Sequence, residues 1–101
     1  MYRTASATRS AIRVDGHDLF LFAGDFPYYR LPRRQWSEML ERLRAAHLNA
    51  AVVTAPWCWH EPEEGEFDLE GLGDPQRDLA AALALCAGHG LHIIFRPGPY
   101  V

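Results

Sequence analysis

The chain has 101 residues, of which 49% are hydrophobic and 23% are charged, and its formal net charge is −3. This is the balance of an ordinary soluble globular chain. All of the basic residues are arginines and no run of like charges occurs, so we expect no nucleic-acid partner. The apolar stretches are a few residues long, whereas a bilayer-spanning helix needs ~20, so we also expect no membrane partner.

The amino-terminal segment has the composition of a leader rather than of a folded element. Residues 1–11 are small and polar, and they lack the apolar core of a signal peptide. We therefore expect a disordered leader over residues 1–11, on a cytoplasmic chain. The folded unit is expected over residues 12–101.

The first predicted elements are a hairpin and a buried strand. Residues 12–14 alternate apolar and polar side chains, and the Asp15-Gly16 pair that follows is a strong turn signal. Residues 19–23 form an apolar run that ends at Gly24. This pattern predicts a hairpin that leads into a buried strand.

From Pro32 onward the hydrophobic period becomes that of a helix, which predicts a helix over about residues 33–46. Pro32 is acceptable near the first turn. The apolar stripe of this helix consists of Trp36, Met39, Leu40, Leu43 and Ala46. Residues 50–54 then form a β-prone run without alternation, which is typical of a strand covered on both faces.

A long loop separates the second strand from the second helix. Residues 55–73 contain two prolines and three glycines with no sustained period, and loops of this length are usually functional. The Asp-Pro pair at 74–75 offers a helix start, and Gly90 offers a left-handed helix end. Residues 91–95 are expected to form a third buried strand, which the prolines and glycine of 96–100 should end.

The predicted order of elements is strand, helix, strand, loop, helix, strand. This order describes two consecutive βαβ units and therefore a parallel sheet. Three strands alone leave two unpaired edges. A (β/α)₈ barrel needs ~250 residues, so the chain would hold about three of its eight units. We therefore expect an α/β fold that is a fragment of a larger structure such as a TIM barrel.

Aromatic and charged residues gather at the expected carboxyl ends of the three strands, where parallel α/β proteins place their functional groups. Rings pack against the C–H faces of pyranoses and charged groups bond to hydroxyls, so this set suits a sugar. A role in the core is the alternative for the tryptophans. The candidate sugar-binding residues are Tyr28, Arg30, Thr54, Trp57, Arg96 and Tyr100.

Trp57 is expected to lie nearest the sugar, because it comes three residues after the second strand, whereas Trp59 lies further along the loop. His60 and Glu61 are expected to hold the loop by hydrogen bonds. These two residues are adjacent and no third ligand stands at a compatible spacing, so we expect no metal and no cofactor. Cys58 and Cys86 fit neither a disulfide framework nor a zinc site, and are expected to be small buried hydrophobic residues.

Several motifs in register carry a resemblance to a known family. They are the Trp-Cys-Trp-His-Glu-Pro run at 57–62, the Glu-Gly-Glu-Phe-Asp-Leu run at 64–69, the Arg-Pro-Gly-Pro-Tyr run at 96–100, the Tyr-Tyr-Arg-Leu-Pro-Arg run at 28–33, Trp36, and Leu-Asn-Ala at 48–50. Together they resemble the amino-terminal part of the glycoside hydrolase family 35 β-galactosidases. The resemblance covers about residues 12–101.

This resemblance implies a retaining glycosidase on a (β/α)₈ barrel, acting on a β-linked galactoside or a related saccharide. The two catalytic glutamates of such an enzyme follow the fourth and seventh strands, so no catalytic residue is expected in this chain and the chain alone should be inactive. Glu63, Glu64 and Glu66 are then solvated charges. Thr54 stands where the family usually carries a sugar-binding tyrosine, which puts galactose specificity in doubt. The alternative is a non-catalytic carbohydrate-binding or assembly module.

Overall fold

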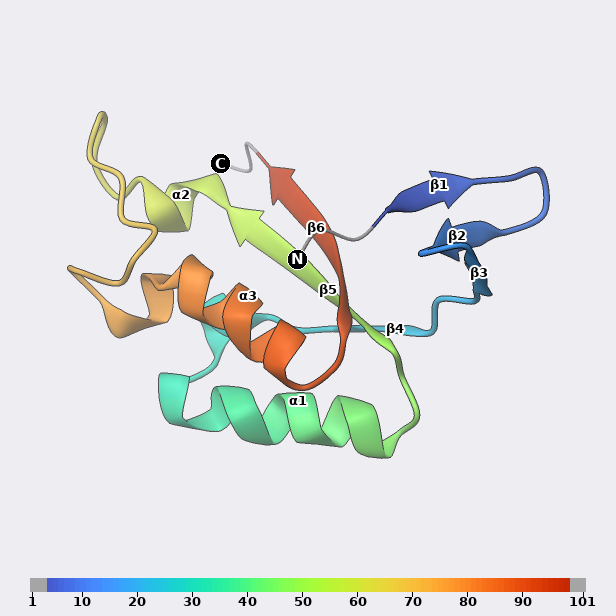
Figure 1. Cartoon of the computed structure of the whole chain (residues 1–101). Coiled ribbons are helices and arrows are strands. Elements are labelled where there is room, and N and C mark those ends of the chain that lie inside the picture. Colours follow the sequence, from blue (N-terminus) through green and yellow to red (C-terminus); the bar gives the residue numbers. More distant parts are fainter. Residues whose placement is uncertain (1–3, 99–101) are drawn as a thin grey trace.

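The computed structural model describes residues 4–98 as a mixed α/β structure with two three-stranded sheets (Figure 1). Its elements are β1 (Ala5–Ala7), β2 (Ile12–Val14), β3 (His17–Leu19), β4 (Ala23–Asp25), η1 (Tyr28–Arg30), η2 (Arg33–Gln35), α1 (Trp36–Ala45), β5 (Ala50–Pro56), α2 (Trp57–His60), η3 (Pro75–Arg77), α3 (Leu79–Gly88) and β6 (His92–Gly98). Over these residues, no helix has the length and apolar character needed to cross a bilayer.

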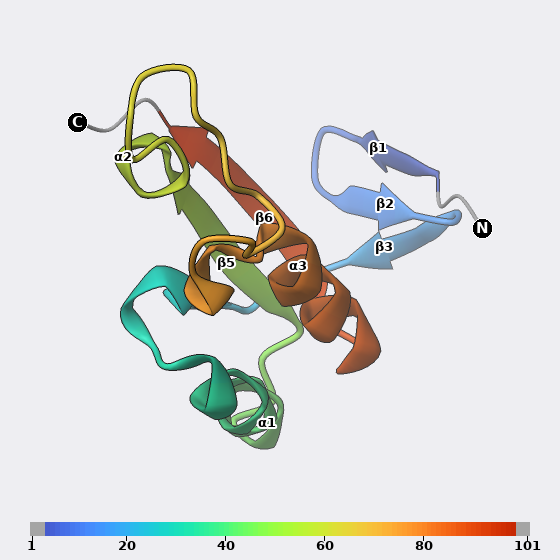
Figure 2. The same ribbon diagram turned by 90° about the vertical axis from the view of Figure 1, so that its left-hand side faces the viewer.

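An antiparallel sheet of order β1-β2-β3 occupies the amino-terminal part and stands apart from the rest of the molecule (Figure 2). Asp15 and Gly16 both have positive φ, at 51° and 81°, as a type I′ hairpin turn requires, which confirms the predicted hairpin. A disordered leader was expected over residues 1–11. In the structure, Ala5–Ala7 instead forms a strand that pairs with β2. Asp15 secures this strand by accepting a hydrogen bond from the Thr4 amide at 3.0 Å.

The second sheet has the order β4-β5-β6 with both pairs parallel, which confirms the parallel sheet predicted from the order of elements. The first of these strands lies at Ala23–Asp25 and not at residues 19–23. Phe20 and Phe22 are 74% and 56% exposed, so the prediction of a buried strand there was wrong. In this region the chain is a connection between the two sheets, and neither helix covers it.

The helices α1 and α3 pack on one face of the parallel sheet and contact each other (Figure 1). Side chains alternate along β5, so Ala51, Val53 and Ala55 are buried against the helices. A Cβ at Gly24 would lie 2.6 Å from Leu43 Cδ2, so a larger residue there would require the Leu43 side chain to shift. On the opposite face of β5, Ala50 is buried but Val52 and Thr54 are only partly buried, so the expected cover on both faces is incomplete.

The predicted first helix is confirmed as η2 followed by α1. The second helix is divided at its start. Asp74 accepts from the Gln76 amide at 2.9 Å and begins η3, whereas Asp78 accepts from the Ala81 amide at 2.9 Å and begins α3. Gly90 has a φ of 72°, as predicted for the residue that ends this helix.

The third strand, β6, continues through Arg96 and Pro97 to Gly98, so the expectation that the prolines end it after Phe95 was wrong. β6 is an edge strand and pairs only with β5. A proline is tolerated on an edge strand because its missing N–H can lie on the unpaired side. The strand therefore reaches as far toward the carboxyl edge as β5 does, with Pro56 opposite Gly98.

Candidate functional site

The carboxyl ends of β4, β5 and β6 lie at one edge of the parallel sheet, which we call the carboxyl edge. The segment from α2 to η3 leaves the sheet at this edge, beyond the arrowheads of β5 and β6 in Figure 1. We call residues 61–74 within that segment the loop. Because parallel strands end together, candidate residues that are far apart in the sequence meet here.

Polar side chains occupy the face of the sheet opposite the helices. Thr54 and Arg96 are register partners on β5 and β6, so their side chains leave the same face. Asp25 pairs with Val52, two residues before Thr54, and lies on this face as well. Thr54 is half-buried, whereas Arg96 and Asp25 are exposed. The structure therefore brings the candidates Thr54 and Arg96 side by side.

Arg30 lies apart from this pair, on the turn η1. It is exposed, and its guanidinium carbon lies 5.4 Å from the centre of the Tyr29 ring. This is the distance of a cation–π contact. Tyr100 lies outside the described residues.

Tyr28 is fully buried in the core and not exposed at the edge, which corrects its expected place among the sugar contacts. Its ring makes an edge contact with Trp36, with ring centres 5.9 Å apart. Burial raises the pKa of the Tyr28 phenol well above its ordinary value, and the nearby Tyr29 raises it further. The hydroxyl therefore stays protonated and acts as a hydrogen-bond donor inside the protein.

His60 is the partner of this hydroxyl and is also fully buried. Its Nε2 lies 2.5 Å from Tyr28 Oη, and its Nδ1 lies 2.7 Å from the carbonyl oxygen of Asp68. A carbonyl only accepts, so Nδ1 carries the proton and Nε2 accepts from Tyr28. The backbone amide of Asp68 in turn donates to the His60 carbonyl at 2.8 Å. His60 thus ties the loop to the core by hydrogen bonds.

The carboxylate of Asp68 organises the turn that follows it. It accepts from the amides of Leu72 and Gly73 at 2.9 Å each, and from that of Asp74 at 3.4 Å. Burial raises the pKa of Asp68, but these backbone hydrogen bonds outweigh it and hold the pKa below its ordinary value. Asp68 was not among the predicted site residues, although an aspartate shortly before a glycine-rich turn is a known signal for such bonds.

Glu61 also contributes to the order of the loop. Its Oε2 accepts from the Gly65 amide at 3.0 Å. Gly65 has a φ of 80°, a conformation that favours glycine, and therefore closes the turn around this carboxylate. His60 and Glu61 both hold the loop through hydrogen bonds to its backbone.

The two tryptophans of α2 have different surroundings. Trp59 donates from Nε1 to the Gln76 carbonyl at 3.3 Å, and the guanidinium carbon of Arg77 lies 4.6 Å from the centre of its ring. Trp57 is 39% exposed and meets Phe67 of the loop, with ring centres 5.5 Å apart at an interplanar angle of 57°. Trp57 is therefore the ring with surface available to a ligand.

The two cysteines also differ. Cys86 is buried in the core as predicted, and burial raises its pKa to about 11. Cys58 is exposed on α2, so its expected burial was wrong, because the turn directs it away from the sheet. In the range 4–98, no three His, Cys, Asp or Glu side chains are grouped as metal ligands.

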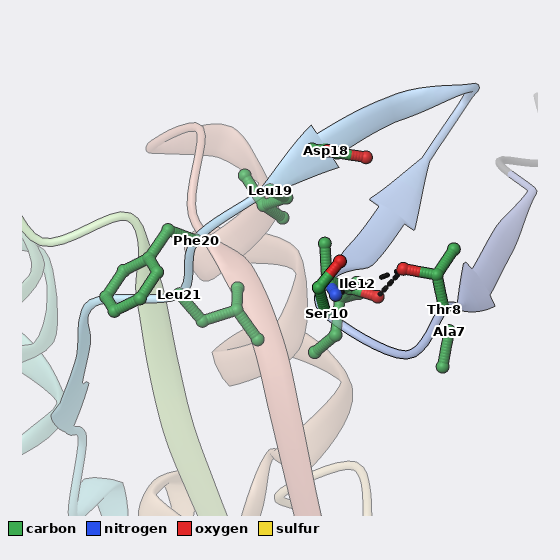
Figure 3. Close-up of a pocket in the computed structure, with 9 residues that line it drawn as sticks. Ala7, Thr8, Ser10, Ile12, Asp18, Leu19, Phe20 and Leu21 are labelled. Carbon is green, nitrogen blue, oxygen red and sulfur yellow. Dashed lines mark hydrogen bonds between the residues drawn. The ribbon is translucent and has the colours of Figure 1, made fainter.

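A cavity of about 580 Å³ lies away from the carboxyl edge (Figure 3). Its walls come from the antiparallel sheet and from Phe20 and Leu21, which lead into the amino end of β4. Most of the lining side chains are apolar. Its position, at the opposite end of the strands from Thr54 and Trp57, separates it from the candidate site.

Similar proteins come from several organisms. The chain is 40% identical over 88 residues to an Exo-beta-D-glucosaminidase of Pyrococcus horikoshii, covering 87% of this chain and 11% of that relative. It is 34% identical over 94 residues to a Beta-galactosidase of Mus musculus, covering 93% and 14%. It is 36% identical over 87 residues to a Beta-1,2-glucosyltransferase of Ignavibacterium album, covering 86% and 12%. The chain thus spans only a small part of the length of these relatives.

The family is identified by a sequence profile described as Glycosyl hydrolases family 35, which matches residues 11–101. The match includes the whole parallel sheet, both long helices, α2 and the loop. It therefore covers every residue that the structure brings to the carboxyl edge. The chain belongs to glycosyl hydrolase family 35.

Proposed function

We propose that this chain is the amino-terminal part of the catalytic barrel of a retaining glycoside hydrolase that acts on terminal β-linked galactosides or a related saccharide. One observation carries the proposal. Thr54 and Arg96 stand side by side at the carboxyl edge, and the exposed ring of Trp57 directly follows β5 there. In a (β/α)₈ barrel this edge is the active-site face.

The exposed apolar surface of β6 supports continuation of the barrel. Ile93 and Phe95 are in register with the buried Ala51 and Val53, so they lie on the helix face of the sheet. Both are nevertheless exposed, whereas Ala51 and Val53 are fully buried. In a barrel, the helix that follows this strand would cover them.

Within this proposal, the chain supplies binding surface and the catalytic glutamates come from later strands. Trp57 packs on the face of the terminal sugar, and Thr54 bonds to one of its hydroxyls. Arg96 holds a carboxylate from a later strand, because a guanidinium that becomes buried needs a paired acceptor. Tyr100 is proposed as a further sugar contact. Tyr28 is not, because it is buried.

Thr54 affects which sugar the site accepts. A threonine is shorter than the tyrosine that the family usually carries here, so this position offers neither a ring face nor a long-reach hydroxyl to the sugar. Similar proteins are named as β-galactosidase and as exo-β-D-glucosaminidase. These names support a terminal β-linked hexose as the substrate class.

The test uses the full-length protein, by which we mean the longer protein that contains this chain. It is offered a panel of aryl β-glycosides that includes the galactoside and the glucosaminide, and the anomer first released is followed by NMR. We expect hydrolysis with retention of configuration. Inversion would contradict the retaining mechanism. Binding without turnover would favour the carbohydrate-binding module instead.

A further inference from the structure

We propose that Phe67 and the groove beside it form a second saccharide subsite, next to Trp57, for the sugar on the leaving-group side of the bond that is cleaved. The inference rests on the proposed function, because it takes Trp57 as part of the site for the terminal sugar. Its ligand is the pyranose next to the terminal sugar of an oligosaccharide.

The touching rings of Trp57 and Phe67 are both exposed. Trp57 is 39% and Phe67 is 56% exposed, and their ring centres lie 5.5 Å apart. We call these two residues the aromatic pair. Trp57 lies on α2 and Phe67 on the loop, so the pair continues the surface outward from Thr54 at the carboxyl edge. A saccharide that starts at Thr54 would pass over Trp57 and then over Phe67.

Phe67 also lines a groove. The groove has a volume of about 270 Å³ and is lined by Phe67, Asp68, Leu69, Glu70 and Leu72. One pyranose ring would occupy only part of this volume. The groove combines an aromatic face and leucine side chains with the carboxylate of Glu70. Carbohydrate sites use this combination, since C–H faces pack on apolar surface while hydroxyls bond to charged acceptors.

The backbone on either side of Phe67 holds this residue in place before any ligand binds. Asp68, its neighbour, is bonded to the loop through its carboxylate and to His60 through its amide and its carbonyl. Glu66, on the other side, donates from its amide to the Glu63 carbonyl at 2.9 Å. A preorganised aromatic ring binds a sugar without a further cost in loop entropy.

The test compares two substrates of the full-length enzyme that share the terminal sugar. One is a disaccharide, which fills both subsites, and the other is the glycosyl fluoride, whose leaving group has no ring. We expect Phe67→Ala to lower kcat/KM for the disaccharide by roughly three- to tenfold, the size of one lost stacking contact. We expect it to leave kcat/KM for the fluoride unchanged.

Further variants separate stacking from packing. Phe67→Leu keeps apolar bulk without a ring face and should behave as Phe67→Ala does, whereas Phe67→Tyr should retain the wild-type values. Phe20→Ala removes an exposed ring far from the carboxyl edge and should leave kcat/KM unchanged for both substrates. Thermal melts of all variants show whether the fold is retained.

The outcomes distinguish this inference from the proposed function. An equal loss on both substrates, no loss on either, or wild-type behaviour of Phe67→Leu would each overturn the second subsite while leaving the proposed function in place. A wild-type enzyme that hydrolyses neither substrate would overturn the proposed function, and this inference with it.

Discussion

At the level of single residues, Trp57 and Trp59 differ in what holds their rings. Residues two apart on a helical turn point roughly 200° apart around its axis, so the two side chains leave α2 on opposite sides. Trp59 meets Gln76 and Arg77, which fix it between η3 and the sheet. Trp57 contacts Phe67 of the loop and keeps exposed surface for a ligand.

This difference predicts different effects of two matched substitutions in the full-length enzyme. Trp57→Ala should lower kcat/KM strongly, because a stacking ring contributes about 0.5–1.5 kcal/mol beyond its buried area. Trp59→Ala should mainly lower the melting temperature, because it removes packing and a hydrogen bond. Steady-state kinetics and thermal melts of both variants check this. A catalytic defect in Trp59→Ala alone, with only a lower melting temperature in Trp57→Ala, would reverse the assignment.

A second prediction concerns the buried bond between Tyr28 and His60. Tyr28→Phe keeps the ring but leaves His60 Nε2 without its donor in the core. An unsatisfied buried acceptor costs about 1–3 kcal/mol, so we expect a loss of unfolding free energy of that order. Tyr29→Phe is the control, since the Tyr29 hydroxyl is not part of this hydrogen-bond chain. Urea unfolding of the full-length protein measures the free energy of unfolding of both variants. Equally small losses in Tyr28→Phe and Tyr29→Phe would show that the bond contributes little.

At the level of elements, the loop behaves as an ordered unit although it has little regular secondary structure. Asp68 connects its two halves, because its carboxylate holds the Leu72–Asp74 turn while its backbone bonds to His60. Gly71 allows this turn, since its φ is 77° and a Cβ there would lie 2.9 Å from Asp78 Cβ. The order of the loop therefore depends on one ionised side chain and one glycine.

The lowered pKa of Asp68 predicts acid sensitivity of the loop. A carboxyl group whose pKa is lower in the folded state stabilises the protein at higher pH, and this contribution is lost as the pH falls through the folded pKa. The loss is therefore expected below about pH 4, where an ordinary aspartate begins to protonate. Asp68→Asn should be less stable than wild type at pH 7, and the difference should shrink at pH 3.

Hydrogen exchange of the Leu72 and Gly73 amides reports the acid sensitivity of the loop directly. In wild type, exchange at these amides should become faster on acidification than the general pH dependence of exchange explains. Glu64→Gln, which changes an exposed carboxylate of the same loop, is the control. A pH response that is the same in wild type and in Asp68→Asn would contradict the role given to this carboxylate.

At the level of the whole molecule, the outer strands of the parallel sheet, β4 and β6, each have one unpaired side within residues 4–98. Ile93 and Phe95 on β6 expose apolar surface. Unpaired strand edges with exposed apolar side chains promote association between chains. We expect the 101-residue chain to self-associate when it is expressed alone. Light scattering after size-exclusion chromatography tests this, and a monomer with a cooperative melt would contradict it.

Local patterns in the sequence determined most of the elements. The helical period predicted α1, the Asp15-Gly16 pair predicted the hairpin, and the alternation of strands and helices predicted the parallel sheet. These features depend on residues close together in the chain, through backbone conformation and the period of apolar side chains. The motifs also indicated the family, because they keep their order and spacing.

The tertiary structure alone decided what is buried and what is exposed. The sequence placed Tyr28 at the site, but packing of η1 against Trp36 and His60 put it in the core. Pro97 lies within β6 opposite Ala55, because the pairing with β5 continues through it. Asp68 gained its role from amides that only the folded loop presents to it. Burial, edge position and hydrogen-bond partners depend on contacts between distant segments, which no local pattern contains.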